Sequence, residues 1–345
     1  MHSSPPKTGS LTVRLVAALA LVALVVVAGM GAYAYSWARR SEVEHELNDL
    51  RILSEHLAAR IDLSLAAGRG LADHLACTRD AQEYLGQGAR QGPPQEAIQA
   101  WLGLQAGRTP GHSAIFLMSP RGICLASSDP AFIGRDFSFR SYFREAMEGR
   151  IATSDWIIGS VTRTPRVFSA APVRVGGGIV GVLVTEFRVE EVEASVRALG
   201  DQGRVAAVFN AQGIILAHTE AGAQYHALEP LDAAAQAELG RTRQFLGRDI
   251  PPYPISPGFV SAFKRVRATS RPETLNYRLG ATAKWGALAP LAQRPWVVLV
   301  AIPEHEILLP VRKALATTLL VAFATALGAV ALGFLLARPH FKPLK

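Results

Sequence analysis

An arginine stands among aromatic residues in the segment FSFRSYFREAMEGR, residues 137–150. The aromatic residues within three positions of Arg140 are Phe137, Phe139, Tyr142 and Phe143. A guanidinium held among rings is well suited to a bidentate pair with a carboxylate, which favours capture of a small anionic ligand by Arg140. The competing interpretation is that Arg140 pairs with Asp136 or Glu145 and only fixes the loop.

The rest of the chain lacks the residue patterns of enzymes. It contains no Walker loop, no G-x-S-x-G sequence and no pair of histidines at metal-ligand spacing. Asp129 and Asp136 flank a turn and are better explained as turn formers than as an acid–base pair. We therefore expect no catalytic residue, metal or cofactor within residues 1–345. Histidine kinase activity would require an output domain beyond them.

Charge and cysteine content argue against two further classes of protein. The formal net charge is +8, but the basic residues are scattered rather than gathered in one stripe, so nucleic acid is not an expected partner. The two cysteines, Cys77 and Cys124, are too few for a disulfide framework. We expect two free, buried thiols, although the two could pair in an oxidising compartment.

Two long apolar runs predict two transmembrane helices. Residues 15–35 and residues 314–337 are uncharged over 21 and 24 positions. At about 1.5 Å per residue, each run can cross a hydrocarbon core of about 30 Å. The first run has a second interpretation as a signal peptide, because residues 32–34 form an A-x-A cleavage sequence.

The flanks of these runs predict their orientation. Residues 1–14 and 338–345 contain five basic residues and no acid. Positive flanks stay in the cytoplasm, whereas long loops are translocated largely regardless of charge. Both termini are therefore predicted to be cytoplasmic, with residues 338–345 as the start of a signalling linker. Residues 38–312 are expected on the periplasmic side of a bacterial inner membrane.

A leucine-rich pattern follows the first run. Apolar residues recur at spacings of three and four between residues 47 and 65, which predicts one long helix over residues 38–85. The sequence GQGARQGPP closes this pattern, so the stalk is assigned to residues 38–95. The apolar stripe that includes Leu50 and Leu57 predicts a homodimer, unless the stripe packs against the protein's own sheets.

The outer segment contains an internal repeat. Residues 116–128 align without gaps to residues 207–219, and Gly122 corresponds to Gly213. Each copy reads as a β-hairpin, with glycine supplying the positive φ of the turn. Further strands follow each copy, which predicts two five-stranded antiparallel sheets with helices on one side. The expected strands are 153–160, 166–173 and 178–187, then 275–280, 284–291 and 296–303.

This arrangement resembles the double-Cache family of extracellular sensor domains in bacterial receptors. The sequence RSYFREAMEG, residues 140–149, resembles the R-x-Y-F-x-x-A-x-x-G element of that family. Residues 168–196 resemble its closing strands and connecting helix. The resemblance implies an α+β fold with a long N-terminal helix and two tandem PAS-like antiparallel sheets, flanked by two transmembrane helices. The membrane-distal Cache unit would be residues 96–199 and the membrane-proximal unit residues 200–303.

Within the family, the chain is similar to sensor histidine kinases for C4-dicarboxylates, through residues 134–150, 159–173 and 224–231. The resemblance implies a ligand pocket in the distal unit, where Arg140 would hold a carboxylate of a small organic acid. The other implied ligand-binding residues are Phe143, Trp156 and Phe168 as walls, Ser160 and Thr162 as hydroxyl donors, and Arg166 as a second cation. Alternatively, Arg166 lies on a solvated strand edge and the two hydroxyls satisfy backbone groups.

Glu186 departs from the dicarboxylate pattern, in which the matching position resembles a lysine. Receptors of the family for amino acids or amines carry an acid there. Glu186 therefore faces solvent, pairs with Arg140 or Arg166, or meets a cationic group of a ligand. An amino-acid receptor, a sensor of a protein partner without small ligand, and a structural anchor all stay open, and the output domain could be a kinase, a diguanylate cyclase or a chemotaxis domain.

Overall fold

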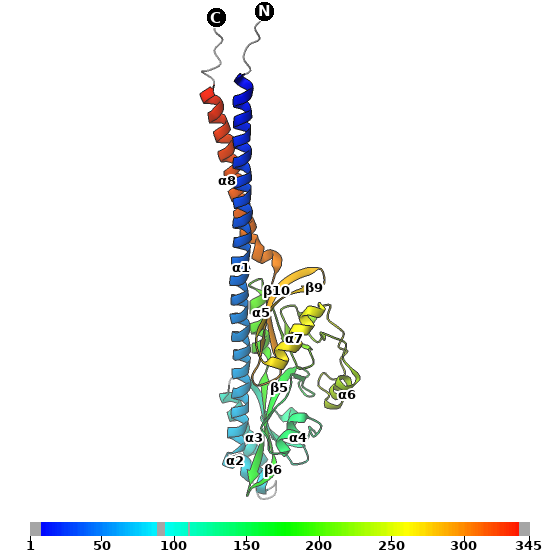
Figure 1. The fold of residues 1–345 in the computed structure, drawn as a ribbon. Helices are drawn as coiled ribbons and strands as arrows, with labels where there is room; N and C mark the ends of the chain where they lie inside the picture. The colour runs from blue at the N-terminus through cyan, green and yellow to red at the C-terminus, as the bar shows by residue number, and fades with distance from the viewer. Residues whose placement is uncertain (1–7, 88–93, 110, 338–345) are drawn as a thin grey trace, which may run out of the picture. The chain divides into compact units, whose positions relative to one another are not determined.

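The structure of the protein is a computed structural model that describes residues 8–87, 94–109 and 111–337 (Figure 1). The chain divides into two compact units. Unit 1 comprises Met1–Asn48 and Pro303–Lys345, and unit 2 comprises Asp49–Ile302. All of the predicted site residues belong to unit 2.

The first helix, α1 (Thr8–Ala76), includes the apolar run 15–35 and most of the predicted stalk. It ends earlier than the expected helix 38–85, because the chain turns at residues 77 and 78 and the Thr78 hydroxyl donates to the Leu75 carbonyl over 2.7 Å. The chain continues as α2 (Arg79–Gln87) and α3 (Gln95–Arg108). Cys77, at this turn, is exposed and not buried as predicted, whereas Cys124 is buried, and both thiols are free.

The apolar stripe of α1 is covered within the chain. Leu50, Leu57, Ile61 and Leu65 are all buried in unit 2. These residues are therefore covered by the protein's own chain and are not left free for a dimer contact. A homodimer, if it forms through α1, uses other residues of the helix.

One helix of the described chain is long and apolar enough to cross a membrane. It is the segment Glu304–Thr325 of α8 (Glu304–Ala337), which begins before the predicted span 314–337. Within unit 1, Glu304 forms an ion pair with Arg39 over 3.4 Å. A pair of spans at 15–35 and 314–337 stays a prediction, and the linker 338–345 lies outside the described residues.

The first module of unit 2 is built on an antiparallel sheet with strand order β2-β1-β6-β5-β3, and β4 also pairs with β5. The sheet has six strands where five were expected, because the stretch predicted as one strand at 153–160 forms two short ones. Its strands are β1 (His112–Met118), β2 (Cys124–Ser127), β3 (Ala152–Thr153), β4 (Ile157–Ile158), β5 (Pro165–Val175) and β6 (Gly178–Arg188).

Both faces of this sheet are covered, contrary to the expectation of helices on one side. On one face, α4 (Ser141–Met147) and the short 3-10 helix η1 (Pro130–Phe132) contribute to a cluster around Phe116. On the other face, α1, α2 and α3 pack against Ile115 and Leu117. Successive residues of β1 point to opposite faces and are apolar on both, which is why neither face is left to solvent.

The second module contains the predicted five-stranded antiparallel sheet, with strand order β8-β7-β11-β10-β9. Its core lies under α7, where Phe259 and Phe263 pack against Phe209 of β7. The strands are β7 (Val205–Phe209), β8 (Ile215–His218), β9 (Glu273–Leu279), β10 (Thr282–Pro290) and β11 (Val297–Pro303). The helices are α5 (Glu190–Gly200), η2 (Ala221–Ala223), α6 (Ala233–Thr242) and α7 (Pro257–Thr269).

The predicted repeat is confirmed as two matching hairpins, β1–β2 and β7–β8. In the first hairpin, the Gly122 amide donates to the Ser119 carbonyl over 2.9 Å. In the second, the Gly213 amide donates to the main-chain carbonyl of Asn210 over 3.0 Å. The φ angles of Gly122 and Gly213 are 84° and 77°. Each turn thus uses glycine for a left-handed backbone conformation.

We expect Gly122→Ala to destabilise the protein more than Gly213→Ala. A side chain with positive φ costs roughly 1–2 kcal/mol at either position. At Gly122 an added Cβ would also lie 2.7 Å from the backbone of Ser138, whereas at Gly213 it would meet the side chain of Leu228 at 3.3 Å, which can shift. Denaturant unfolding of the two variants measures the difference; equal losses of unfolding free energy would contradict this account of the first turn.

Candidate functional site

Arg140 is buried at the start of α4, with 3% of its surface exposed. It is the N-cap residue of this helix. Its Nη1 donates to the carbonyl of Thr242 over 2.9 Å and to the carbonyl of Arg243 over 3.3 Å. Thr242 and Arg243 end α6 of the second module, where helix carbonyls lack partners within the helix.

The guanidinium of Arg140 has unused capacity for an anion. In the described part of the chain, no ion pair joins it to Asp136 or Glu145, and its Nε is buried without a hydrogen-bond partner. Burial is the main cause that lowers the pKa of Arg140, and the nearby Arg243 adds to it. The guanidinium carbons of Arg140 and Arg243 each lie 4.8 Å from the centroid of the Phe139 ring, so two cations contact one aromatic side chain.

Two of the three predicted wall residues lie together on the α4 face of the sheet. Phe168 on β5 stacks on Tyr142, with ring centroids 5.4 Å apart, and Phe143 belongs to the same apolar cluster. Trp156 is fully buried but packs edge-on against Trp296 of the second module, with centroids 6.1 Å apart. Trp156 thus lies where the two modules meet.

The predicted hydroxyl donors lie in the loop between β4 and β5. The amide of Gly159 donates to the carbonyl of Thr164 over 2.9 Å, which closes a tight loop around Ser160 and Thr162. The Thr162 hydroxyl is buried and has no hydrogen-bond partner among the described residues. Buried hydroxyls usually have a partner, so Thr162 retains a donor that a ligand could use.

Glu186 on β6 is 1% exposed and lies opposite Phe168 in the sheet. Its Oε1 lies 3.6 Å from Nε of Arg166, and its Oε2 accepts a hydrogen bond of 2.5 Å from the hydroxyl of Ser113. Ser113 occupies an irregularity in the pairing of β1 with β6. Of the alternatives for Glu186, the structure has the pair with Arg166.

Arg166 is buried and not on a solvated strand edge, since 8% of its surface is exposed. Its Nη1 contacts Oε1 of Glu190 at 2.6 Å and donates to the carbonyl of Pro165 over 2.8 Å. Arg166 is therefore engaged by two carboxylates, whereas Arg140 is engaged only by neutral carbonyls. This contrast makes Arg140 the stronger candidate for recognition of a ligand carboxylate.

We expect Glu186→Gln to gain stability relative to the unsubstituted protein as pH rises. Burial raises the pKa of Glu186 above its ordinary value of 4.5, against the hydrogen bond from Ser113 and the charge of Arg166, which lower it. A raised carboxyl pKa in the folded state favours folding below the unfolded pKa, and this contribution is lost as pH rises through the folded pKa. Glutamine does not titrate and can still accept from Ser113.

Unfolding free energies of the two proteins between pH 4 and pH 7 check this prediction. Loss of the ion pair with Arg166 shifts the unfolding free energy of the variant by an amount that does not depend on the titration of Glu186. The test is therefore how the difference in unfolding free energy between the two proteins changes with pH. A difference that does not change with pH would contradict the raised pKa of Glu186.

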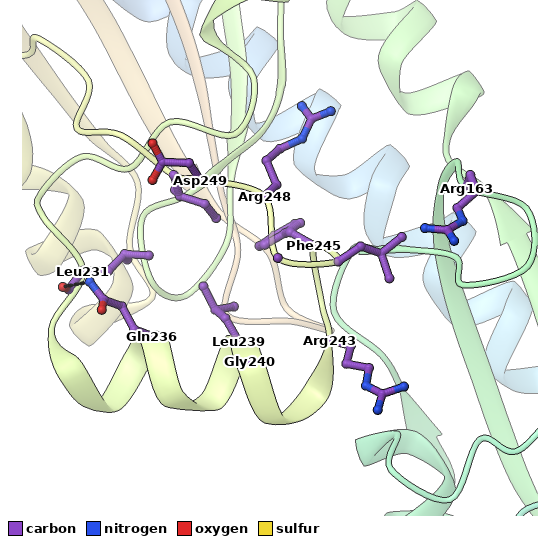
Figure 2. A pocket seen from close by; sticks show the side chains of 12 residues that line it. Arg163, Leu231, Gln236, Leu239, Gly240, Arg243, Phe245, Arg248 and Asp249 are labelled. Carbon is purple, nitrogen blue, oxygen red and sulfur yellow. Dashed lines mark hydrogen bonds between the residues drawn. The ribbon is translucent and has the colours of Figure 1, made fainter.

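A hollow of about 620 Å³ lies beside α6 (Figure 2). Figure 2 shows Gln236 and Leu239 of this helix at the hollow, and Arg243 at the end of the helix with its guanidinium directed away from them. Arg163 contributes from the loop of the first module. The full lining is Arg163, Leu231, Gln236, Leu239, Gly240, Arg243, Phe245, Leu246, Gly247, Arg248, Asp249 and Ile250.

Several residues of this region were missed in the sequence. Thr242, Arg243 and Gln244 are about a hundred positions from Arg140, and Thr242 and Arg243 contact it through backbone atoms. No residue-type pattern marks such a contact. Phe139 was visible only as one aromatic residue of several, and Ser113 reaches Glu186 through an irregular strand pairing that a sequence does not reveal.

The family model and the sequence relatives that match this chain are all sensor proteins or sensor domains. A family model described as a Cache domain matches residues 35–311. The C4-dicarboxylate transport sensor protein DctB of Pseudomonas aeruginosa is 29% identical over 240 residues, which cover 68% of this chain and 34% of that protein. DctB of Rhizobium meliloti is 28% identical over 147 residues, covering 41% of this chain and 23% of that protein. The chain thus spans about a third or less of these relatives.

Solved structures share the fold. The sensor domain of the Vibrio cholerae histidine kinase DctB has a TM-score of 0.64 at 17% identity, covering 75% of this chain and 98% of that one. The sensory domain of the Campylobacter jejuni chemoreceptor Tlp3, solved with isoleucine bound, has a TM-score of 0.53 at 13% identity, covering 79% and 98%. At these identities the likeness concerns the fold alone.

Proposed function

The chain belongs to the double-Cache family, and we propose from this premise that it is the sensor part of a transmembrane receptor that binds a small organic acid in its first module. The proposed ligand class is a C4-dicarboxylate, with the sensor on the periplasmic side of a bacterial inner membrane and a histidine kinase as output. The carrying observation is Arg140, a buried cation that no described carboxylate neutralises.

The electrostatics of Arg140 favour an anionic ligand. Burying a charge is costly unless the charge is paired and hydrogen-bonded. Carbonyl oxygens satisfy some of its N–H groups but do not neutralise it, and the neighbouring Arg243 increases the repulsion. A ligand carboxylate would supply the missing charge and can bond two guanidinium nitrogens at once.

A dicarboxylate is supported by the sequence relatives, two of which are named as C4-dicarboxylate transport sensor proteins. The second carboxylate of such a ligand could accept a hydrogen bond from the Thr162 hydroxyl, which lies in the same module and has no hydrogen-bond partner among the described residues. Ser160 neighbours it in the loop. Arg166 is a weaker candidate for this role because Glu186 and Glu190 already engage it.

An amino acid is the second candidate, and Glu186 is the observation that favours it. The Oε1 atom of this buried carboxylate has no hydrogen-bond partner among the described residues. An ammonium group could donate to it while the carboxylate of the same ligand pairs with Arg140. The Campylobacter jejuni chemoreceptor with isoleucine bound shares this fold, so the scaffold is compatible with such a ligand.

Thermal unfolding of the full chain in detergent micelles, with a panel of dicarboxylates, amino acids and amines, tests the proposal. A ligand at 100 times its dissociation constant adds about 2.7 kcal/mol of stability. This corresponds to a rise of several degrees in melting temperature. If no compound of the panel shifts the transition, the small-ligand proposal fails, and a protein partner becomes the better candidate.

A further inference from the structure

A three-residue segment of the second module, Thr242–Gln244, contacts Arg140, the proposed carboxylate-binding residue, and the backbone of residues 156 and 158 in the first module. The carbonyls of Thr242 and Arg243 accept from Arg140. The carboxamide of Gln244 donates to the carbonyl of Trp156 over 3.1 Å. The carbonyl of Gln244 accepts from the amide of Ile158 over 2.8 Å. These contacts hold one short segment at both Arg140 and the strand beside it.

We propose that Thr242–Gln244 is an intramolecular latch that engages Nη1 of Arg140 and is displaced from it by the ligand carboxylate. The inference rests on the proposed function, since it assigns the regulation of the same site. The backbone carbonyls of the latch take the place of carboxylate oxygens. Ligand binding and release of the latch are thereby one exchange of partners at Arg140.

The relative strengths of the two sets of bonds favour this exchange. A guanidinium bonds a carboxylate more strongly than a neutral carbonyl, and often through two parallel N–H groups. The latch has the advantage of being attached to the same chain, which gives it a high effective concentration. It therefore holds Arg140 when ligand is absent and yields when a carboxylate of sufficient concentration arrives.

The surroundings of the latch give it room to move. The hollow of about 620 Å³ is lined by Arg243 itself and by its neighbours Gly240, Phe245 and Leu246, so one side of the latch faces open space, whereas Gln244 on the other side is buried (Figure 2). Closely packed interiors resist displacement, whereas a segment beside a hollow can shift with less loss of contact.

The backbone around the latch is also held in an uncommon conformation. Arg243 and Leu246 have φ angles of 50° and 53°, in the left-handed region that residues with side chains seldom adopt. Such conformations persist only when surrounding contacts enforce them, and they are frequent at switch segments. Arg243 takes this conformation as the C-cap of α6, where its amide donates to the carbonyls of Gly240 and Leu239.

Release of the latch has a route to the rest of the chain. The strand stretch that binds Gln244 also holds the second module through Asp155, whose Oδ1 accepts from the Trp296 indole over 2.7 Å. Arg294 donates to the carbonyl of Thr153 over 2.9 Å. Trp296 directly precedes β11, which continues in sequence into α8. Release of Gln244 removes its hydrogen bonds to residues 156 and 158, which lie next to the residues that contact Arg294 and Trp296.

The test compares Gln244→Met with Gln236→Met in the full chain in micelles. Gln244→Met keeps a similar volume but removes the donor to Trp156. Gln236 lies in α6 and its carboxamide donates to the nearby carbonyl of Leu231, outside the first module. The same substitution at this exposed position controls for the change of side chain without touching the first module. Two measurements are made: the affinity for succinate and for isoleucine, and hydrogen exchange of peptides covering residues 156–160, which report the Ile158 amide.

We expect Gln244→Met to bind the accepted ligand at least about three-fold more tightly than the control, because a larger fraction of the protein is already open. Without ligand, exchange at residues 156–160 should be faster in Gln244→Met than in Gln236→Met. In the unsubstituted protein, saturating ligand should speed exchange at Ile158. Unchanged or weaker affinity, or protection of Ile158 by the ligand, would overturn the latch.

Failure of the proposed function gives a different result. If neither succinate nor isoleucine binds to any of the proteins at millimolar concentration, the ligand proposal fails for these compounds. Hydrogen exchange at residues 156–160, measured without ligand, then tests the latch independently of the ligand proposal. Equal exchange at residues 156–160 in Gln244→Met and Gln236→Met would show that the segment is not held there by an openable contact.

Discussion

Arg140→Ala is expected to weaken ligand binding by the full chain by at least about 30-fold. Arg140 is the buried cation of the first module without a described carboxylate partner, and the proposed ligand supplies that partner. Removing one member of a buried, hydrogen-bonded charge pair costs about 2–5 kcal/mol, or roughly 30- to 4,000-fold in affinity. Calorimetric titration with the compound that raises the melting temperature measures the loss.

Two further variants make this result specific. Arg135→Ala removes an exposed arginine from the loop before Arg140 and should leave affinity within about two-fold, because solvent and salt screen an exposed charge. Arg140→Lys keeps the charge but loses the planar, bidentate geometry, so it should bind more weakly than the unsubstituted protein and more tightly than Arg140→Ala. Full affinity of Arg140→Ala would show that the ligand binds elsewhere.

Glu186→Gln is expected to separate the two ligand classes. If an ammonium group of an amino acid pairs with Glu186, neutralising this carboxylate should weaken amino-acid binding by roughly 30-fold or more, as for other buried charge pairs. Dicarboxylate binding should be retained or strengthened, because a buried negative charge near the ligand is removed. Titration of the variant with succinate and with isoleucine distinguishes these outcomes.

The control is Glu190→Gln, because Glu190 pairs with Arg166 as Glu186 does but is more exposed to solvent. Glu190 contacts Arg166 at 2.6 Å, but half of its side chain, 51%, is exposed. This substitution should change the affinity for either ligand less than Glu186→Gln does. An equal loss in both variants would mean that Arg166, rather than the charge of Glu186 itself, determines ligand selection.

The fold was predictable because its signals are local. Runs of apolar strand residues, and glycines at matched positions of a repeat, were enough for two antiparallel sheets and for hairpins at Gly122 and Gly213. The covering of both faces of the first sheet was missed, although both residue sets of β1 are apolar. The break of the long helix after Ala76 was also missed, because it carries no proline or glycine.

The site was predictable only in part, for physical reasons that concern distance along the chain. The pair of Glu186 with Arg166 was among the alternatives because a glutamate at the end of an apolar strand is costly to bury without a partner. The partners of Arg140 were not, since the main-chain carbonyls of Thr242 and Arg243 have no residue-type signature. Trp156 was predicted as a wall of the ligand pocket, whereas its contact with Trp296 depends on how the two modules meet, which the sequence does not reveal.

Hydrogen exchange of the full chain, with and without saturating succinate or isoleucine, tests the central claim most directly. If the first module holds a ligand carboxylate at Arg140, peptides covering α4 should exchange more slowly with one of these ligands. Protection limited to the second module, or no protection of any peptide at millimolar ligand, would contradict the claim that the first module is the ligand-binding one.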